Sequence, residues 1–343
     1  MLSRVQPALA AGRRGAAAPG VWTLSAPDRD GLRRNIRAQA VHLARRDEAD
    51  LAALCYTSNK IKASLPHRFA VPADSLGGLL ETMRAAVRDP ATLDALTGGG
   101  HPRVRYGLVL PGIDAWPTGA PIGVSEAPGG FLDYLNEATT EFRVVEDCLD
   151  LYDDRVEDAG GVRGAALFCV EYALGRALYA LDLNPAFLAG NGVGAAAAAC
   201  LTGALTLNDA SARFVGLPRL DPERAPRVPL LSAADGTGTG RWLTPDGPRT
   251  APPEDVGHLV RVGPSGRFAR RVEDAMRAHG PPARVVTVAA DAGRDLLALV
   301  AALFREGFEV KWEAAYSREH RTLRGLAPYA FARTGHPHER GTT

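Results

Sequence analysis

The chain has 343 residues, enough for two domains or for one domain with a large appendage. Its composition, 46% hydrophobic and 23% charged, is that of a globular protein that can bury a substantial core. Lysine and arginine number 40 against 39 aspartates and glutamates. The resulting net charge of +1 supplies no overall basic field and argues against nucleic acid or an anionic membrane as a partner.

The four cysteines are far apart and form no CxxC pair, which favours reduced core thiols over disulfides or a zinc site. They are Cys55, Cys148, Cys169 and Cys200. The first 20 residues lack the continuous apolar segment of a signal peptide, and no later stretch is long and uncharged enough to span a bilayer. We therefore predict a cytoplasmic protein with a disordered leader at residues 1–20, no metal and no cofactor.

The segment after this leader predicts a small α/β unit. Residues 21–26 alternate like a strand, and Asp28 is placed to cap a helix whose apolar positions recur at helical spacing. A second helix is predicted from residue 48 to about 57 and a strand at 66–71, after which Ser75 caps a third helix.

Linker composition at residues 88–103 separates this unit from a second one. The second unit opens with an apolar strand at 105–110. That strand runs into residues 111–112, the βα turn position at which open α/β sheets bind ligands. Helices are predicted at 130–149 and 162–181, and the second of these is apolar around most of its circumference, as in a helix buried against a sheet.

Residues 190–194 read Gly-Asn-Gly-Val-Gly, between a short buried strand at 185–189 and a helix of small residues at 195–201. This is the strand, tight turn and helix of a nucleophile elbow, in which the middle residue supplies the attacking side chain. Here the middle residue is Gly192, which has no side chain. Glycine does accept the positive φ of an elbow at no steric cost.

The rest of the chain continues the α/β pattern. We predict a helix ending at Phe214, a strand at 228–232, a surface loop at 235–253, helices at 252–260 and 268–278, a strand at 285–289, a helix at 296–304 and an extended tail at 312–333.

From residue 21 to residue 333 the order of segments resembles a modular type I polyketide synthase, in its acyltransferase (malonyl-CoA:ACP transacylase-like) region with the flanking linker and strap. Residues 22–87, with their Leu24-Ser25-Ala26 opening, resemble the linker between ketosynthase and acyltransferase, and GNGVGAAAAACLTGALTLND at 190–209 resembles the GHSxG elbow and the helices behind it. Residues 229–243, 258–259 and 267–269 resemble the elements that close the acyltransferase domain. GFEVKW at 307–312 and LAPYAF at 326–331 resemble the post-acyltransferase strap.

The resemblance implies an α/β fold in which an α/β-hydrolase-like large domain with a mostly parallel sheet follows a small N-terminal α/β linker domain. The implied divisions are a linker domain at 21–103, a truncated acyltransferase-like domain at 104–306, a strap at 307–333 and a disordered tail at 334–343.

The departures from the family fall on its catalytic positions. The elbow serine, which forms the acyl-enzyme, corresponds to Gly192, and the histidine beside it corresponds to Asn191. Ile113 replaces the glutamine whose backbone amide helps to bind the oxyanion. The arginine that binds extender-unit carboxylates corresponds to about Leu217, and Arg213 lies one turn earlier. The resemblance therefore implies that this chain has no catalytic residue.

The family also has a small ferredoxin-like subdomain that carries its catalytic histidine. Only residues 218–227 stand in its place, too few for several strands and helices when one strand averages about five to six residues. His258 corresponds to a histidine that lies in a structural helix of the family and offers no replacement. Loss of the subdomain should uncover a face that polar side chains or another protein must cover.

These observations favour a free-standing, catalytically inactive acyltransferase-like protein of polyketide biosynthesis. Since the sequence begins at Met1 without a ketosynthase, we expect it to dock in trans to a ketosynthase, an acyl carrier protein or both. Two alternatives stay open. One is an acyltransferase or thioesterase-like enzyme whose catalytic groups have moved to Cys200 or to a water near Asp114, and the other is a protein that binds an acyl or phosphopantetheine group without reacting.

Overall fold

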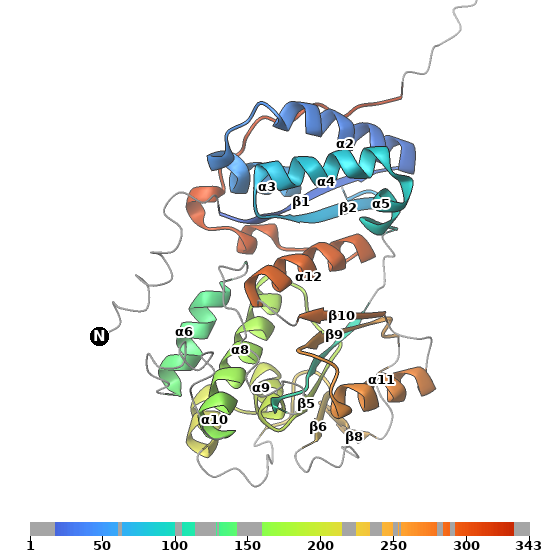
Figure 1. The fold of residues 1–343 in the computed structure, drawn as a ribbon. Helices are drawn as coiled ribbons and strands as arrows, with labels where there is room; N and C mark the ends of the chain where they lie inside the picture. Colours follow the sequence, from blue (N-terminus) through green and yellow to red (C-terminus); the bar gives the residue numbers. More distant parts are fainter. Residues whose placement is uncertain are drawn as a thin grey trace, which may run out of the picture.

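The computed structural model forms two α/β units joined by a shared helix and a C-terminal strap (Figure 1). The residues it describes are 18–60, 64–99, 105–113, 128, 130–142, 160–214, 224–233, 242–249, 253, 255–279, 284–288 and 292–332. Most of the predicted leader and all of the predicted tail lie outside these residues. Within the described parts of the chain, no helix has both the length and the apolar character needed to cross a membrane.

The small unit is a three-stranded antiparallel sheet in the order β1-β2-β3 with helices packed on it. Its elements are β1 (Gly20–Ala26), α2 (Arg29–Leu43), α3 (Leu51–Lys60), β2 (His67–Ala73), α4 (Leu76–Arg88), α5 (Pro90–Ala95) and β3 (Thr97–Gly99). Both predicted helix caps are confirmed, since Asp28 accepts a hydrogen bond from Gly31 N and Ser75 accepts one from Gly78 N.

The prediction of a linker at residues 88–103 is wrong for its described part, which folds into α5 and β3. Asp89 caps α5 and Pro90 is its first residue, a position where the missing N–H costs nothing. Position 98 of β3 requires a glycine, because a Cβ there would collide with the carbonyl oxygen of Arg305. The proline therefore starts a helix, and the glycine allows two backbones to approach closely. A linker has the same proline- and glycine-rich composition, so composition alone does not distinguish the two cases.

The large unit is a seven-stranded sheet in the order β10-β9-β4-β5-β6-β7-β8, with its first five strands parallel. Its strands are β4 (Tyr106–Leu110), β5 (Phe187–Asn191), β6 (Leu230–Ala233), β7 (Trp242–Thr244), β8 (Gly247–Arg249), β9 (His258–Val262) and β10 (Arg284–Val288). Its helices are α6 (Phe131–Glu141), α8 (Gly160–Ala180), α9 (Val193–Leu201), α10 (Leu207–Phe214) and α11 (Arg267–His279).

Helices cover both faces of this sheet, with α8 and α9 on one face and α11 on the other (Figure 1). Side chains of a strand point alternately to its two faces, so Leu108 and Leu110 join the core under α8 while Val109 joins the core under α11. The burial of all five residues of β4 follows from this double cover.

Two predictions in the large unit are wrong. Residues 258–262 form β9, a strand between β10 and β4, where a helix was predicted at 252–260. A short apolar run is compatible with either element, and its periodicity does not decide between them. The predicted surface loop at 235–253 contains β7 and β8, a hairpin that extends the sheet from β6.

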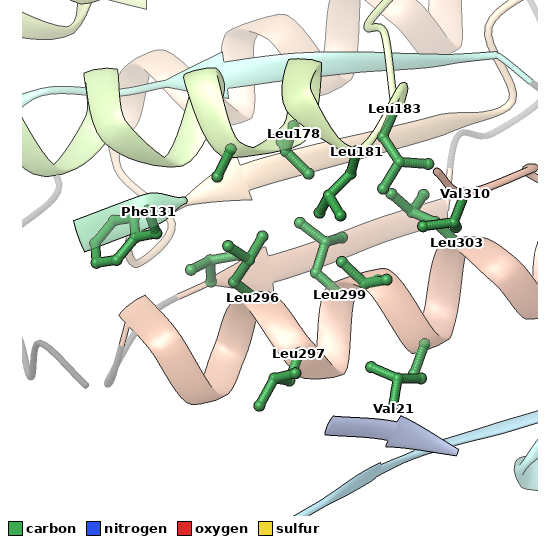
Figure 2. Close-up of a cluster of buried hydrophobic side chains, with 14 of the residues drawn as sticks. Val21, Phe131, Leu178, Leu181, Leu183, Leu296, Leu297, Leu299, Leu303 and Val310 are labelled. Atoms are coloured by element: carbon green, nitrogen blue, oxygen red, sulfur yellow. The ribbon is translucent and has the colours of Figure 1, made fainter. Parts of the chain in front are cut away.

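The helix α12 (Ala292–Glu306) lies between the two units and joins them in one core cluster that contains residues of both (Figure 2). On one side Leu296 and Leu299 point toward Leu178 and Leu181 of the large unit, and Leu297 points to the opposite side of the helix, on which Val21 of β1 lies.

After α12 the strap (residues 307–332) returns along the small unit, through the short turns η3 (Trp312–Ala315) and η4 (Arg318–His320) and then as extended chain. Gln39 of α2 bonds both backbone groups of Ala327, donating to its oxygen at 2.8 Å and accepting from its nitrogen at 3.2 Å. Ala330 N donates to Asn35 at 2.9 Å, and Arg324 N donates to Thr57 at 2.8 Å. Side chains of α2 and α3 thus hold the strap by its backbone.

Candidate functional site

The site begins at the turn between β5 and α9, where Gly192 has φ 54° and ψ −120°. This conformation is strained for any residue with a side chain. The carbonyl oxygen of Gly192 accepts from Ala195 N at 3.0 Å and from Ala196 N at 3.3 Å, which starts α9. A Cβ built on Gly192 would meet no atom of the described residues within 4 Å. The turn is thus a complete elbow whose central position faces open space and carries no reactive group.

The glycines on either side of the elbow are required by close packing. A Cβ on Gly190 would collide with the carbonyl oxygen of Gly194, and a Cβ on Gly194 would collide with the carbonyl oxygen of Leu110. The backbones of β5, α9 and β4 therefore meet without side chains between them. The elbow is fixed by contacts that do not depend on a nucleophile.

Asn191, the last residue of β5, holds the neighbouring βα turn against the elbow. Its side chain is only 6% exposed, and its Nδ2 donates to Pro111 O at 3.4 Å. Gly112 has φ 68°, and a Cβ there would collide with the carbonyl oxygen of Asn191. Ile113 follows and packs against the core. The structure therefore brings Asn191, Gly192 and Ile113 together at the carboxyl edge of the parallel strands.

Glu171 of α8 is a further member of this site. It is fully buried, and its Oε1 accepts from Gly112 N at 3.3 Å. Its Oε2 would lie 3.0 Å from a Cβ on Gly194 and has no hydrogen-bond partner within the described residues. Burial raises the pKa of the Glu171 carboxyl to about 8, so the group is protonated at neutral pH. Sequence reasoning missed it, although a single acid in an otherwise apolar helix was the available signal.

Comparison with known sequences identifies relatives of this chain. The model of the CurL-like polyketide synthase C-terminal family matches residues 20–83. Polyketide synthase GfsA from Streptomyces halstedii is 28% identical over 214 residues, which cover 60% of this chain and 3% of the synthase. The chain therefore spans only a small fraction of the length of that synthase.

Solved structures extend the likeness to almost the whole chain. The acyltransferase domain from module 8 of the salinomycin polyketide synthase is 19% identical with a TM-score of 0.62, over 87% of this chain and 98% of that one. The acyl transferase domain of ZmaA is 15% identical with a TM-score of 0.63, over 92% and 100%. The chain has the fold of a polyketide synthase acyltransferase region. The predicted fold and family resemblance are thus confirmed.

Several other sequence-predicted positions are not described by the structure, and His258 lies away from the elbow. Leu217, Asp114 and Cys148 lie outside the described residues, as does the side chain of Arg213. His258 is the first residue of β9 rather than part of a helix, which corrects the prediction for this histidine. Because β9 is parallel to β4 and β5, His258 lies at the amino edge of the sheet, opposite the elbow. There its Nε2 lies 3.3 Å from Glu306 Oε2.

Cys200 of α9 is the thiol nearest in sequence to the elbow, but it is not activated. Its Sγ donates to Thr206 O at 3.5 Å, and burial raises the pKa of the thiol to about 12. A thiol attacks as the thiolate, so this cysteine has almost no nucleophilic form at neutral pH.

A cavity of about 490 Å³ adjoins the elbow of this acyltransferase fold at the same carboxyl edge of the sheet. Its lining residues are Asn191, Ser265, Gly266, Arg267, Phe268, Arg270 and Arg271. Apart from Asn191 they belong to the turn after β9 and to the first two turns of α11. The cavity is therefore strongly basic on the side that faces the empty elbow.

Proposed function

We propose that this chain is a catalytically inactive acyltransferase-like protein of polyketide biosynthesis that serves as a structural or docking partner of a ketosynthase, an acyl carrier protein or both. The observation that carries the proposal is the elbow itself. Gly192 keeps the backbone of a nucleophile position, at φ 54° and ψ −120°, without a side chain to attack a thioester. A fold that keeps this geometry after losing its nucleophile is maintained for something other than acyl transfer.

Acyl transfer by this fold needs a nucleophile and a general base in contact with each other. Among the described side chains, the histidines are far from the elbow in the fold: His42 and His67 are in the small unit, His320 is in the strap and His258 is at the opposite edge of the sheet. The thiol of Cys200 is protonated. The alternative of a relocated catalytic centre therefore has no support from these groups.

The surface formed by α2 and the strap supports a docking role. Three large hydrophobic side chains of these two segments are exposed: Val41 of α2 is 61% exposed, and Leu323 and Phe331 of the strap are 60% and 78% exposed. Leu323 and Phe331 belong to the strap, whose backbone is held by hydrogen bonds from α2 and α3, so their side chains project from an ordered segment. Exposed apolar groups on an ordered surface are a common property of protein interaction sites.

Co-purification tests the docking proposal. The full chain should form a complex with a ketosynthase or a carrier protein encoded beside its own gene. The double substitution L323A/F331A should weaken that complex at least tenfold, and Val285→Ala, which truncates an exposed side chain on β10, should leave it unchanged. Failure to bind either class of protein would contradict the proposal.

The enzyme alternative is tested separately by intact mass measurement after incubation with malonyl-CoA and related thioesters. We expect no acyl adduct and no thioester hydrolysis above the uncatalysed rate. An adduct on the intact chain that disappears in Cys200→Ala would establish a relocated nucleophile and overturn the proposal.

A further inference from the structure

We propose that a cavity between the strap and α6 binds a small zwitterion, an α-amino acid with an apolar side chain. The cavity has a volume of about 370 Å³, within the range of about 300 to 1,000 Å³ that is usual for small-molecule sites. Its walls come from the residues just before β1, the start of α6, Leu297 of α12 and the strap between Ala314 and Arg321. None of the described residues that line it belongs to the elbow, so the site depends neither on acyl chemistry nor on a docking partner.

The acidic wall of this cavity is Asp133, which lies in the first turn of α6. Its side chain is exposed, and it forms no hydrogen bond or ion pair with any residue that the structure describes. An ammonium group brings three N–H donors to such a carboxylate. The Asp133 carboxylate is therefore open to a cationic group that enters the cavity.

The basic wall is Arg321 of the strap. Its Nε donates to Tyr316 O at 3.0 Å, whereas neither of its Nη groups donates to a described residue. The hydrogen bond from Lys60 and, to a smaller extent, the charge of Arg321 lower the pKa of Glu313, but Glu313 forms its ion pair with Lys60. The planar N–H fork of Arg321 is thus oriented by the backbone and free to bind a carboxylate with two hydrogen bonds.

The two charges line one cavity without pairing with each other, because separate contacts fix the two walls. Asp133 belongs to α6, which packs on α8. Arg321 follows Tyr316, whose buried hydroxyl accepts hydrogen bonds from Val21 N and Asn59 Nδ2. A molecule that carries both an ammonium and a carboxylate group can pair with the two walls at once, which a singly charged molecule cannot do.

The rest of the lining suits an apolar side chain next to these charges. Leu132, Leu297 and Pro19 contribute apolar surface to the cavity. Ser317 and His320 add polar groups on the strap side, where Ser317 Oγ lies 2.9 Å from His320 Nδ1. A few polar groups among apolar ones are typical of small-molecule sites, in which the polar groups fix the orientation of the ligand.

Calorimetric titration of the full chain tests the site with three probes of nearly equal size. They are L-leucine, leucinamide, which lacks the carboxylate, and N-acetylleucine, which lacks the ammonium group. We expect saturable binding of leucine and at least tenfold weaker binding of each of the other two. No saturable binding of leucine, or equally tight binding of either singly charged probe, would overturn the proposal.

Matched variants assign the two charges to their walls. Asp133→Asn and Arg321→Gln should each weaken leucine binding at least tenfold. The controls are Asp30→Asn, an exposed acid in the first turn of α2, and Arg318→Gln, an exposed arginine of the strap that does not line the cavity. Both controls should leave the affinity for leucine unchanged. Equal weakening by a control and by its cavity variant would show that general charge is responsible and would overturn the proposal.

Discussion

The elbow and the strap differ in the contacts that hold their backbones and in the side chains that they expose. At the elbow, backbones meet without side chains between them, because Gly190 and Gly194 leave no room for a Cβ, and the central position presents nothing. At the strap, side chains such as Gln39 and Asn35 hold the backbone by hydrogen bonds, and large apolar groups are presented outward. The comparison teaches that the backbone of the elbow is fixed by close packing that needs no nucleophile, whereas the backbone of the strap is fixed by side-chain hydrogen bonds and carries exposed apolar groups.

Gly194→Ala gives the sharpest test of the packing side of this comparison. The added Cβ would collide with the backbone oxygen of Leu110, and a clash with backbone is not relieved by a change of rotamer. We expect a loss of about 3 kcal/mol in the free energy of unfolding, measured by urea denaturation. Gly77→Ala is the control, since a Cβ there meets nothing within 4 Å, and it should be neutral or stabilising. Equal effects of the two substitutions would refute the steric account.

Glu171 makes the stability of the elbow side depend on pH. The unfolded chain loses this proton near pH 4.5, but the folded protein holds it to about pH 8, so folding is progressively disfavoured as the pH rises between these values. The slope is about 1.4 kcal/mol per pH unit and falls as the folded group begins to titrate near pH 8, so the loss between about pH 6 and 8 is about 2 kcal/mol.

Glu171→Gln removes this titration and keeps an oxygen that can accept from Gly112 N. Its stability should change less with pH than that of the parent, and its relative advantage should grow toward alkaline pH. Denaturation midpoints measured from about pH 5 to 9 would check this, and parallel profiles for the two proteins would contradict it.

Tyr316→Phe probes the strap side. The hydroxyl of Tyr316 accepts from Val21 N at 3.2 Å and from Asn59 Nδ2 at 2.9 Å, and all three residues are buried. Its removal leaves two buried donors without this acceptor, at a cost of about 1 to 2 kcal/mol in thermal or urea unfolding. Tyr329→Phe, in the partly exposed end of the strap, should change stability by less than about 0.5 kcal/mol. A larger loss of stability in Tyr329→Phe than in Tyr316→Phe would contradict the conclusion that the buried Tyr316 hydroxyl helps to hold the strap.

Gly192→Ser has the smallest expected effect. A side chain at this position has space but must adopt a positive φ, so we expect a cost of about 1 kcal/mol. The variant should form no acyl adduct with malonyl-CoA in an intact mass measurement, because no described histidine is near enough to act as its base. An adduct at the introduced serine would mean that only the nucleophile has been lost.

The elements that the sequence predicted well depend on local signals. Asp28 and Ser75 cap their helices through neighbouring N–H groups, and the elbow follows from the spacing of three glycines. The helix predicted at 252–260 was wrong because the strand character of residues 258–262 comes from pairing with β4, which is remote in sequence. The hairpin of β7 and β8 was missed because it adds to β6 at a sheet edge in a stretch with loop composition.

The candidate site divides in the same way. Asn191, Gly192 and Ile113 were found because they occupy motif positions. Glu171 and the arginines of α11 were not found, since a helix in the middle of the chain and a turn after β9 come together only in the folded sheet. Glu171 stands out because it is buried, and the arginines of α11 stand out because they line one cavity. Neither property can be predicted from the spacing of residues along the chain.

The placement of α12 has a consequence for how the molecule melts and how it can be divided. Leu296 and Leu297 lie on one helix and belong to one core cluster that includes residues of both units, so neither unit can be cut from the chain without exposing part of this core. Heat should therefore unfold both units in a single calorimetric transition rather than in two steps. A destabilising substitution at the elbow would then also lower the fraction of molecules in which α2 and the strap are folded, although the elbow belongs to the other unit.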